Sequence, residues 1–187
     1  MKRTNDTLIL IVGILLFLVS YKFDNQVNLL FKGMRLQFFD AVLSITTNFG
    51  VVIIVMLIIP SIILYKRNKK LIYLIWSTFV ISFVLAFVIK LIMLRQRPIE
   101  AFTYPFTHII NYSFPSMHAM VAFSLLPILT KYMPKQRFFW IIFVFLAAFG
   151  RIYFGFHFLS DVVFGALSGY FIGSYLLDLH GKGKLWK

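Results

Sequence analysis

Residues 71–94, LIYLIWSTFVISFVLAFVIKLIML, decide the fold of this chain. The stretch is apolar apart from a few hydroxyl side chains and Lys90 near its end. About 20 consecutive apolar residues are enough for a helix to cross the hydrocarbon core of a bilayer. The stretch therefore predicts a transmembrane helix that carries one ionisable residue.

The composition of the whole chain is that of a membrane protein. Hydrophobic residues make up 60% of the 187 residues and charged residues only 13%, whereas soluble domains average about 45–50% and about 25%. The chain has no cysteine, which excludes disulfides and thiolate chemistry. Its six Asp and Glu residues are scattered, so we expect no metal site and no cofactor.

Windows of about 19 residues predict an all-α, polytopic protein that forms a single membrane domain over residues 1–187. Six spans are expected, at residues 7–21, 40–65, 71–94, 115–132, 138–156 and 158–177. No small-residue cleavage site follows the first, so we expect a retained anchor rather than a signal peptide. Apolar residues between Val27 and Phe38 recur at helical spacing, which predicts a short interfacial helix or an ordered loop.

The net charge of +13 would indicate a nucleic-acid partner in a soluble protein. In a membrane protein, Lys and Arg instead gather in cytoplasmic segments. An even number of spans places both termini on one side, and most of the basic residues lie on that side. We therefore expect cytoplasmic termini and no nucleic-acid partner.

The last span contains Gly165, Gly169 and Gly173, which repeat every four residues. This spacing clears one helix face for close contact with another helix. We expect packing inside the bundle in preference to dimerisation, and a monomer or weak homodimer in the membrane.

Ionisable residues at membrane depth are costly and usually functional. Lys90 and Arg97 lie seven residues apart, so on a continuous helix they share one face about 10 Å apart, until Pro98 ends the helix. Lys90 alone could also be a lysine that reaches out to the lipid headgroups.

Two further polar clusters follow. Ser116 and His118 open the fourth span, where the free amides of a first helical turn favour an anion; a structural role for His118 is the alternative. His157 and Asp161 are four residues apart on a helix, and a carboxylate can fix the tautomer of a nucleophilic histidine. The alternative for Asp161 is an ion pair with Arg151.

In the six-span topology these clusters meet on one face of the membrane. Three cations can bind and stabilise a phosphoryl group, one histidine can attack it, and the other can act as general acid. The pattern thus indicates phosphoryl transfer without a metal.

Three motifs in this order resemble the signature of the type 2 phosphatidic acid phosphatase (PAP2) superfamily, which includes bacterial lipid and polyprenyl-pyrophosphate phosphatases. The motifs are Lys90-x6-Arg97-Pro98, Pro115-Ser116-Met117-His118 and Arg151-x5-His157-x3-Asp161. The resemblance implies a PAP2-like helical bundle in which His157 attacks phosphorus to give a phosphohistidine while Asp161 holds its ring. His118 would protonate the departing lipid oxygen. The residues expected at the phosphate are Lys90, Arg97, Ser116, Met117 and Arg151.

The chain departs from the usual motifs at two positions. Gly150 stands where the family has a serine, which removes a hydroxyl contact to phosphate or a helix cap. Met117 replaces a glycine, which puts the close approach of the backbone to phosphate in doubt.

The expected function is a lipid phosphatase with its active site on the extracytoplasmic side. Its substrate could be polyprenyl pyrophosphate, phosphatidylglycerol phosphate, phosphatidic acid or a phosphorylated glycolipid such as lipid A. The competing hypothesis is a transporter or flippase of anionic lipids, although no clear internal repeat is present. The aromatic-rich loop 95–114, which includes His108, either covers the site, contacts lipid chains or is an ordinary interfacial loop.

Overall fold

The structure is a computed structural model that describes residues 2–65, 68–98 and 112–185. Every regular element in this part of the chain is helical, which confirms the predicted all-α class. The elements are α1 (Lys2–Gly33), α2 (Gln37–Thr46), α3 (Phe49–Ile53), the π-helical turn η1 (Ile54–Ile58), α4 (Ile59–Tyr65), α5 (Lys69–Met93), α6 (Met117–Tyr132), the 3-10 turn η3 (Pro134–Gln136), α7 (Arg137–Tyr153) and α8 (Leu159–Gly181).

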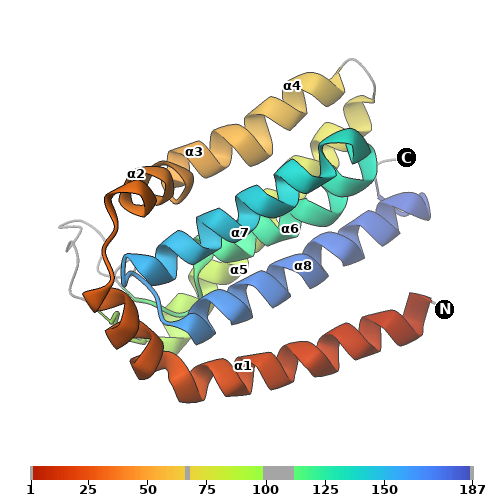
Figure 1. Cartoon of the computed structure of the whole chain (residues 1–187). Helices are drawn as coiled ribbons and strands as arrows, with labels where there is room; N and C mark the ends of the chain where they lie inside the picture. The colour runs from red at the N-terminus through yellow and green to blue at the C-terminus, as the bar shows by residue number, and fades with distance from the viewer. Residues whose placement is uncertain (1, 66–67, 99–111, 186–187) are drawn as a thin grey trace.

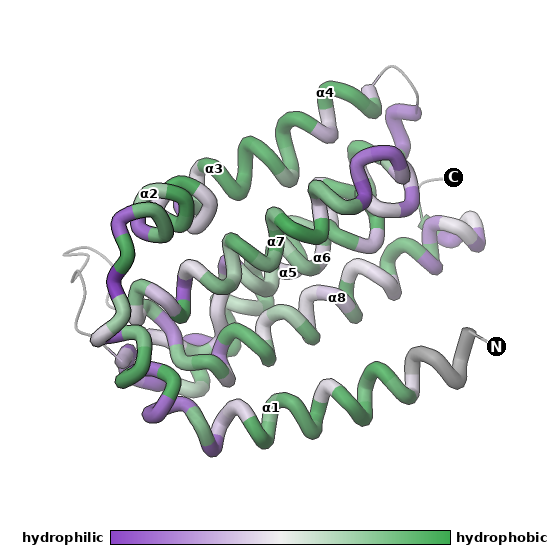
Figure 2. The backbone as a smooth tube through the Cα atoms, in the orientation of Figure 1, coloured by the Kyte–Doolittle hydropathy of each residue, from purple (hydrophilic) through white to green (hydrophobic). Residues whose placement is uncertain are grey.

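The predicted count of six spans is not confirmed. Over the described residues, four helical stretches are long and apolar enough to cross a membrane: Thr7–Gly33, Lys69–Met93, Pro134–Tyr153 and Leu159–Gly181. The bent pair Gln37–Thr46 and Phe49–Tyr65 would make a fifth. Helix α6 has only 16 residues, fewer than the roughly 20 that a bilayer needs. Hydrophobic residues line the middle of the helices, and hydrophilic ones gather at both ends of the bundle (Figure 2).

Helix α6 forms the centre of the bundle, with α5, α7 and α8 packed around it (Figure 1). The glycines of α8 allow this packing, because a Cβ on Gly169 would lie 2.1 Å from the Met120 carbonyl oxygen. A Cβ on Gly173 would lie 1.8 Å from the Ser124 carbonyl oxygen. The prediction that the glycine stripe packs inside the bundle is confirmed.

The prediction of a first helix that ends near Tyr21 is wrong. Helix α1 continues without a break to Gly33, so neither the separate interfacial helix nor the loop that the sequence suggested after it is present. Asp24 consequently lies inside a helix, where its side chain is buried and paired with Arg95. That pairing allows the polar segment to remain helical against the bundle.

The expected span 40–65 is broken near its start. Asn48 interrupts it, because its side-chain oxygen accepts hydrogen bonds from the backbone N–H groups of Gly50, at 2.9 Å, and Val51, at 3.3 Å. This is the capping geometry of a new helix start. Helix α2 and the stretch from α3 to α4 are accordingly bent by 55°.

Helix α5 ends earlier than the sequence suggests. It stops at Met93, and Leu94 follows in a left-handed conformation with φ 47°. The chain therefore turns before Arg97, so Lys90 and Arg97 do not share a face of one continuous helix. The end of α5, the start of α6 and the α7–α8 junction lie at one end of the bundle, and the start of α1 and the end of α8 lie at the other (Figure 1).

Candidate active site

The polar residues singled out by the three motifs meet at the end of the bundle where α6 begins. Each histidine lies within electrostatic range of the same three cations. The residues that the structure brings together are Lys90, Arg97, His118, Arg151, His157 and Asp161. The ends of four helices, α5, α6, α7 and α8, and the segments next to them thus supply one cluster.

Lys90 is turned into the protein. It is 2% exposed, and its ammonium group donates hydrogen bonds to the carbonyl oxygens of Tyr112, at 2.7 Å, and Ser113, at 3.2 Å. A lysine that reached for the lipid headgroups would not be buried in this way. These bonds also anchor the segment that leads into α6.

Ser116 and the first turn of α6 form an anion-binding geometry. The Ser116 backbone N–H donates to the Asp161 carbonyl oxygen at 3.0 Å, which fastens the start of α6 to α8. The Ser116 hydroxyl is buried and has no hydrogen-bond partner in the described part of the protein. A buried hydroxyl normally has a partner, and a helix N-terminus favours a negative charge. An anionic ligand would accept a hydrogen bond from the Ser116 hydroxyl and would also lie favourably at the N-terminus of α6.

Met117 is the first residue of α6 and is half-buried. Leu94 is the only non-glycine residue with a positive φ in the described segments. The position of Met117 therefore does not require the backbone freedom of a glycine.

The second departure, Gly150, is explained by helix packing. A Cβ on Gly150 would lie 2.9 Å from the Cβ of Thr47. The Thr47 hydroxyl donates to the Ala147 carbonyl oxygen at 3.1 Å and so ties α7 to the end of α2. Thr47 occupies the space that a serine side chain at position 150 would need.

Arg97 and Arg151 both hold the loop that carries His157. The Nη1 of Arg97 donates to the Phe156 carbonyl oxygen at 2.8 Å. The Arg151 guanidinium carbon lies 4.5 Å from the centre of the Phe156 ring. The Arg151 carbonyl oxygen also accepts the backbone N–H of His157 at 3.1 Å. Both cations therefore contact Phe156, the residue that precedes His157.

His157 is 3% exposed and lies between the candidate spans of α7 and α8. Its Nδ1 is 3.7 Å from Oδ2 of Asp161. This distance is longer than a hydrogen bond, but catalytic hydrogen bonds are often long before the substrate binds. Burial lowers the pKa of His157 below its usual value, and the positive charges of Lys90, Arg151 and Arg97 lower it further. The imidazole is therefore neutral at neutral pH.

His118 is half-buried at the second position of α6. The Phe49 ring packs edge-on against it, with 4.7 Å between the ring centres. The backbone of Thr47 lies within interaction range of the imidazole. The ring is thus positioned by the break between α2 and α3.

The cation that the structure pairs with Asp161 is Arg95. Its Nη1 lies 2.7 Å from Oδ1 of Asp161, and its Nη2 lies 2.7 Å from Oδ2 of Asp24. The sequence pattern does not single out Arg95, Asp24 or Ser160, because their contacts join residues 65 to 136 positions apart. The sequence did offer one indication: a carboxylate buried in an apolar helix needs a cation as its partner, which predicts a pair for Asp161 without identifying Arg95.

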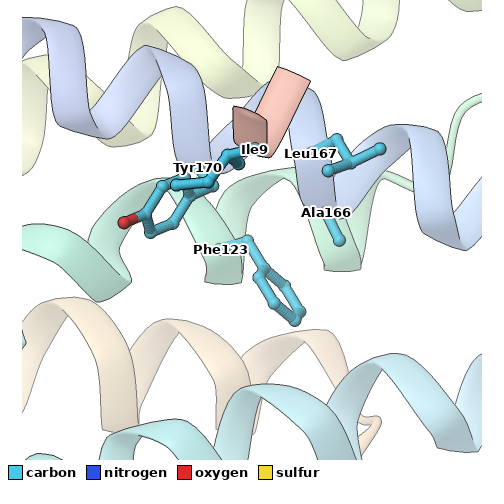
Figure 3. A pocket seen from close by; sticks show the side chains of 5 residues that line it. All are labelled: Ile9, Phe123, Ala166, Leu167 and Tyr170. Atoms are coloured by element: carbon cyan, nitrogen blue, oxygen red, sulfur yellow. The ribbon is translucent and has the colours of Figure 1, made fainter. Parts of the chain in front are cut away.

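An apolar crevice also lies between α1, α6 and α8 (Figure 3). It measures about 230 Å³ and is lined by Ile9, Phe123, Ala166, Leu167 and Tyr170. Ile9 is 15 residues from Asp24 along α1, which places the crevice about 22 Å from the polar cluster along the helix axis. It is therefore separate from the candidate active site.

The aromatic loop is described only at its ends. Phe102, Tyr104, Phe106 and His108 lie outside the described residues. Tyr112 contributes the carbonyl oxygen that Lys90 binds. The Phe114 ring packs against Phe164, with 4.7 Å between the ring centres.

Residues 70–184 match the family model of the PAP2 superfamily, and this stretch contains all three motifs. An undecaprenyl-diphosphatase from Sulfolobus acidocaldarius is 29% identical over 133 residues, and the match covers 67% of this chain and 63% of that protein. The match thus spans less than two thirds of that relative.

The fold is similar to a crystal structure of a transmembrane PAP2 type phosphatidylglycerolphosphate phosphatase from Bacillus subtilis. The TM-score is 0.72 at 20% sequence identity, over 95% of this chain and 96% of that chain. At this identity the similarity shows a common fold. The apolar helices that are long enough to cross a membrane support an integral membrane protein.

Proposed function

The chain belongs to the PAP2 superfamily, and we propose that it is an integral-membrane phosphatase that removes a terminal phosphate from a lipid. The observation that carries this proposal is the meeting of two histidines and three cations beside the free N-terminus of α6. We propose that residues 1–187 act as a single phosphatase domain.

Substrate binding is the first step. The phosphate oxygens bind Lys90, Arg97 and Arg151, together with the first amides of α6 and the Ser116 hydroxyl. In a site this buried, these positive groups act in a low dielectric and strengthen one another's effect on the anion. The start of α6, including Met117, supplies backbone donors rather than a side-chain contact.

Transfer to histidine is the second step. The Nε2 atom of His157 attacks phosphorus while Nδ1 keeps its proton towards Asp161. The bound phosphate offsets the three cations and so lets His118 bind a proton. The bond between phosphorus and the lipid oxygen then breaks, and the protonated His118 gives that oxygen its proton. The products of this step are the dephosphorylated lipid and a phosphohistidine.

Hydrolysis regenerates the enzyme. His118 removes a proton from a water molecule, whose oxygen attacks phosphorus, and the bond from phosphorus to Nε2 of His157 breaks. Inorganic phosphate leaves and both histidines return to their starting state. The side chains of this protein supply every proton and every positive charge in the scheme, so neither a metal nor a cofactor takes part.

The substrate is a lipid phosphate or diphosphate held at the membrane surface. Polyprenyl pyrophosphate and phosphatidylglycerol phosphate are supported by the names of the two similar proteins, while phosphatidic acid and a phosphorylated glycolipid such as lipid A present the same group. Besides this substrate, only membrane lipids are proposed as partners, and the protein acts as a monomer or weak homodimer.

Phosphate release from purified protein in detergent tests the proposal. We expect the wild-type protein to release phosphate from at least one lipid of this panel and His157→Ala to be inactive. A His157→Ala protein with the wild-type rate would overturn the proposal. Binding of lipid phosphates without any release by the wild type would favour the transporter or flippase hypothesis.

A further inference from the structure

One guanidinium group joins three helices at the candidate site. Arg95 lies two residues beyond the end of α5. Its Nη1 donates to Oδ1 of Asp161 at 2.7 Å and to the Ser160 hydroxyl at 2.8 Å, both in α8. Its Nη2 donates to Oδ2 of Asp24 in α1 at 2.7 Å. Both ends of the fork are thus engaged by carboxylates from different helices.

The environment of Arg95 fixes its orientation. The Asp161 side chain is 0% exposed, that of Asp24 5% and that of Arg95 23%. Buried carboxylates are costly unless they are paired, so one cation compensates two of them. The guanidinium carbon lies 4.1 Å from the centre of the Phe158 ring and 5.3 Å from that of Tyr21, which orients its plane.

Asp24 is tied to the same turn of α8. Its Oδ1 accepts the backbone N–H of Ser160 at 2.8 Å, and its Oδ2 accepts the Ser160 hydroxyl at 2.5 Å. The first N–H groups of a helix have no partner within the helix, and a negative charge there is favourable. A carboxylate of α1 therefore caps α8 and holds Arg95 at the same time.

Hydrogen bonds to both carboxylate oxygens fix the orientation of the Asp161 side chain. Its Oδ1 is held by Arg95, and its Oδ2 accepts the backbone N–H of Phe158 at 2.8 Å. The second oxygen is also the one that lies 3.7 Å from Nδ1 of His157. Rotation of the carboxylate would break both hydrogen bonds.

We propose that Arg95 is a positioning residue for the reaction, which fixes Asp161 so that its Oδ2 faces Nδ1 of His157, and that Asp24 holds Arg95 in this place. The inference rests on the proposed phosphatase function. Asp24 lies outside residues 70–184, so this role adds an element from α1 to the part of the chain that matches the family. A lysine cannot replace Arg95, because one ammonium group lacks the fork that spans two carboxylates.

The central variant is Arg95→Gln. Loss of orientation of a catalytic group costs on the order of 100-fold, so we expect kcat to fall about 100-fold while KM changes less than about threefold. We expect Arg95→Lys to restore little of this loss. The matched control is Arg35→Gln, which removes an exposed arginine at the same end of the bundle, paired with Asp40 at 3.2 Å. It should retain kcat within about twofold.

A double-variant cycle separates positioning from mere structural support. If Arg95 acts through Asp161, Arg95→Gln should lower kcat by less than about threefold in an Asp161→Asn background. A full additional 100-fold loss there would overturn the inference, as would an Arg95→Gln protein with the kcat of the wild type. An effect on KM alone would indicate direct phosphate binding and would equally overturn it.

Arg95→Gln alone leaves two buried carboxylates without their cation and could unfold the protein. The double variant Asp24→Asn/Arg95→Gln keeps the net charge of the network and leaves one carboxylate. We expect it to fold, as judged by Tm in detergent, and to show the same loss of kcat. Wild-type kcat in the folded double variant would contradict the inference.

Nitrogen NMR of histidine-labelled protein gives a readout that needs no activity. The chain has four histidines, and the His157 signal is the one that His157→Ala removes. We expect its proton on Nδ1 in the wild type and a shift towards Nε2 in the Arg95 variants. An unchanged tautomer would overturn the inference even if no lipid were hydrolysed, and inactivity of the wild type would count against the proposed function instead.

Discussion

At the scale of single residues, His157 combines deep burial with three neighbouring cations. Both features lower its pKa and keep the imidazole neutral and nucleophilic. A neutral imidazole at pH 7 needs no further activation before it attacks phosphorus. The same three cations can therefore bind the phosphate and keep the pKa of His157 low.

The pH dependence of kcat/KM follows from this environment. Because the pKa of His157 lies below its usual value of 6.5, protonation should abolish activity only below pH 6.5. The measurement is a kcat/KM profile for a short-chain lipid phosphate. Lys90→Met removes one cation, so its residual activity should be lost at higher pH than that of the wild type. A wild-type profile in which activity is lost on acidification with a midpoint above pH 6.5 would contradict this account.

Ser116 should separate activity from stability. Its hydroxyl has no partner in the described part of the protein, so Ser116→Ala removes no internal hydrogen bond and Tm should change little. A hydrogen bond to a charged group contributes about 1.5–3 kcal/mol, so kcat/KM should fall about 10- to 100-fold. Unchanged kinetics, or a large drop in Tm, would argue that the hydroxyl does not contact phosphate.

At the scale of elements, the contact between α6 and α8 positions the site, because the first turns of both helices carry it. Gly173→Ala places a methyl group where the Ser124 carbonyl oxygen lies 1.8 Å away. Overpacking of this kind costs about 1–3 kcal/mol. We expect a clear decrease in Tm in detergent, with loss of activity at temperatures the wild type tolerates.

Gly181→Ala provides the matched control on the same helix. Nothing lies within 4 Å of a Cβ at this position, and alanine favours a helix by up to about 1 kcal/mol over glycine. Its Tm should be equal to or above that of the wild type. Equal losses for the two variants would contradict the packing assigned to the glycine stripe.

The helical class and the glycine contact follow from the sequence because composition and spacing report them directly. The end of α5 cannot be predicted from the sequence. A helix that ends in a left-handed residue usually has glycine there, and this helix has Leu94. The break at Asn48 is not predictable from the sequence either. Asparagine often caps a helix, but it also occurs inside helices, so the residue type alone does not place a break.

The candidate active site could be predicted in part, because the spacing of its motifs is visible in the sequence. Its two histidines and the three cations that we propose to bind phosphate belong to spaced motifs that can be recognised in the sequence. Arg95 and Asp24 form contacts across 71 positions of the chain, and no local pattern encodes such a pair.

At the scale of the whole molecule, we propose cytoplasmic termini and an extracytoplasmic site from the placement of the basic residues in the sequence. The absence of native cysteine makes this testable by single substitutions. Met34 and Gln136 are both exposed and lie in the α1–α2 and α6–α7 connections. A membrane-impermeant maleimide should label Met34→Cys in intact cells and Gln136→Cys only after permeabilisation, and the reverse pattern would invert the proposed orientation.

The transfer of phosphate to His157 is the central claim, and trapping the intermediate tests it most directly. Purified protein would be mixed with a lipid labelled in its terminal phosphate, quenched within the first turnover and analysed for bound label. We predict label on the wild-type protein that is stable in alkali and lost in acid, as expected for a phosphohistidine, and none on His157→Ala. Phosphate release without such label, or label that persists in His157→Ala, would contradict the account.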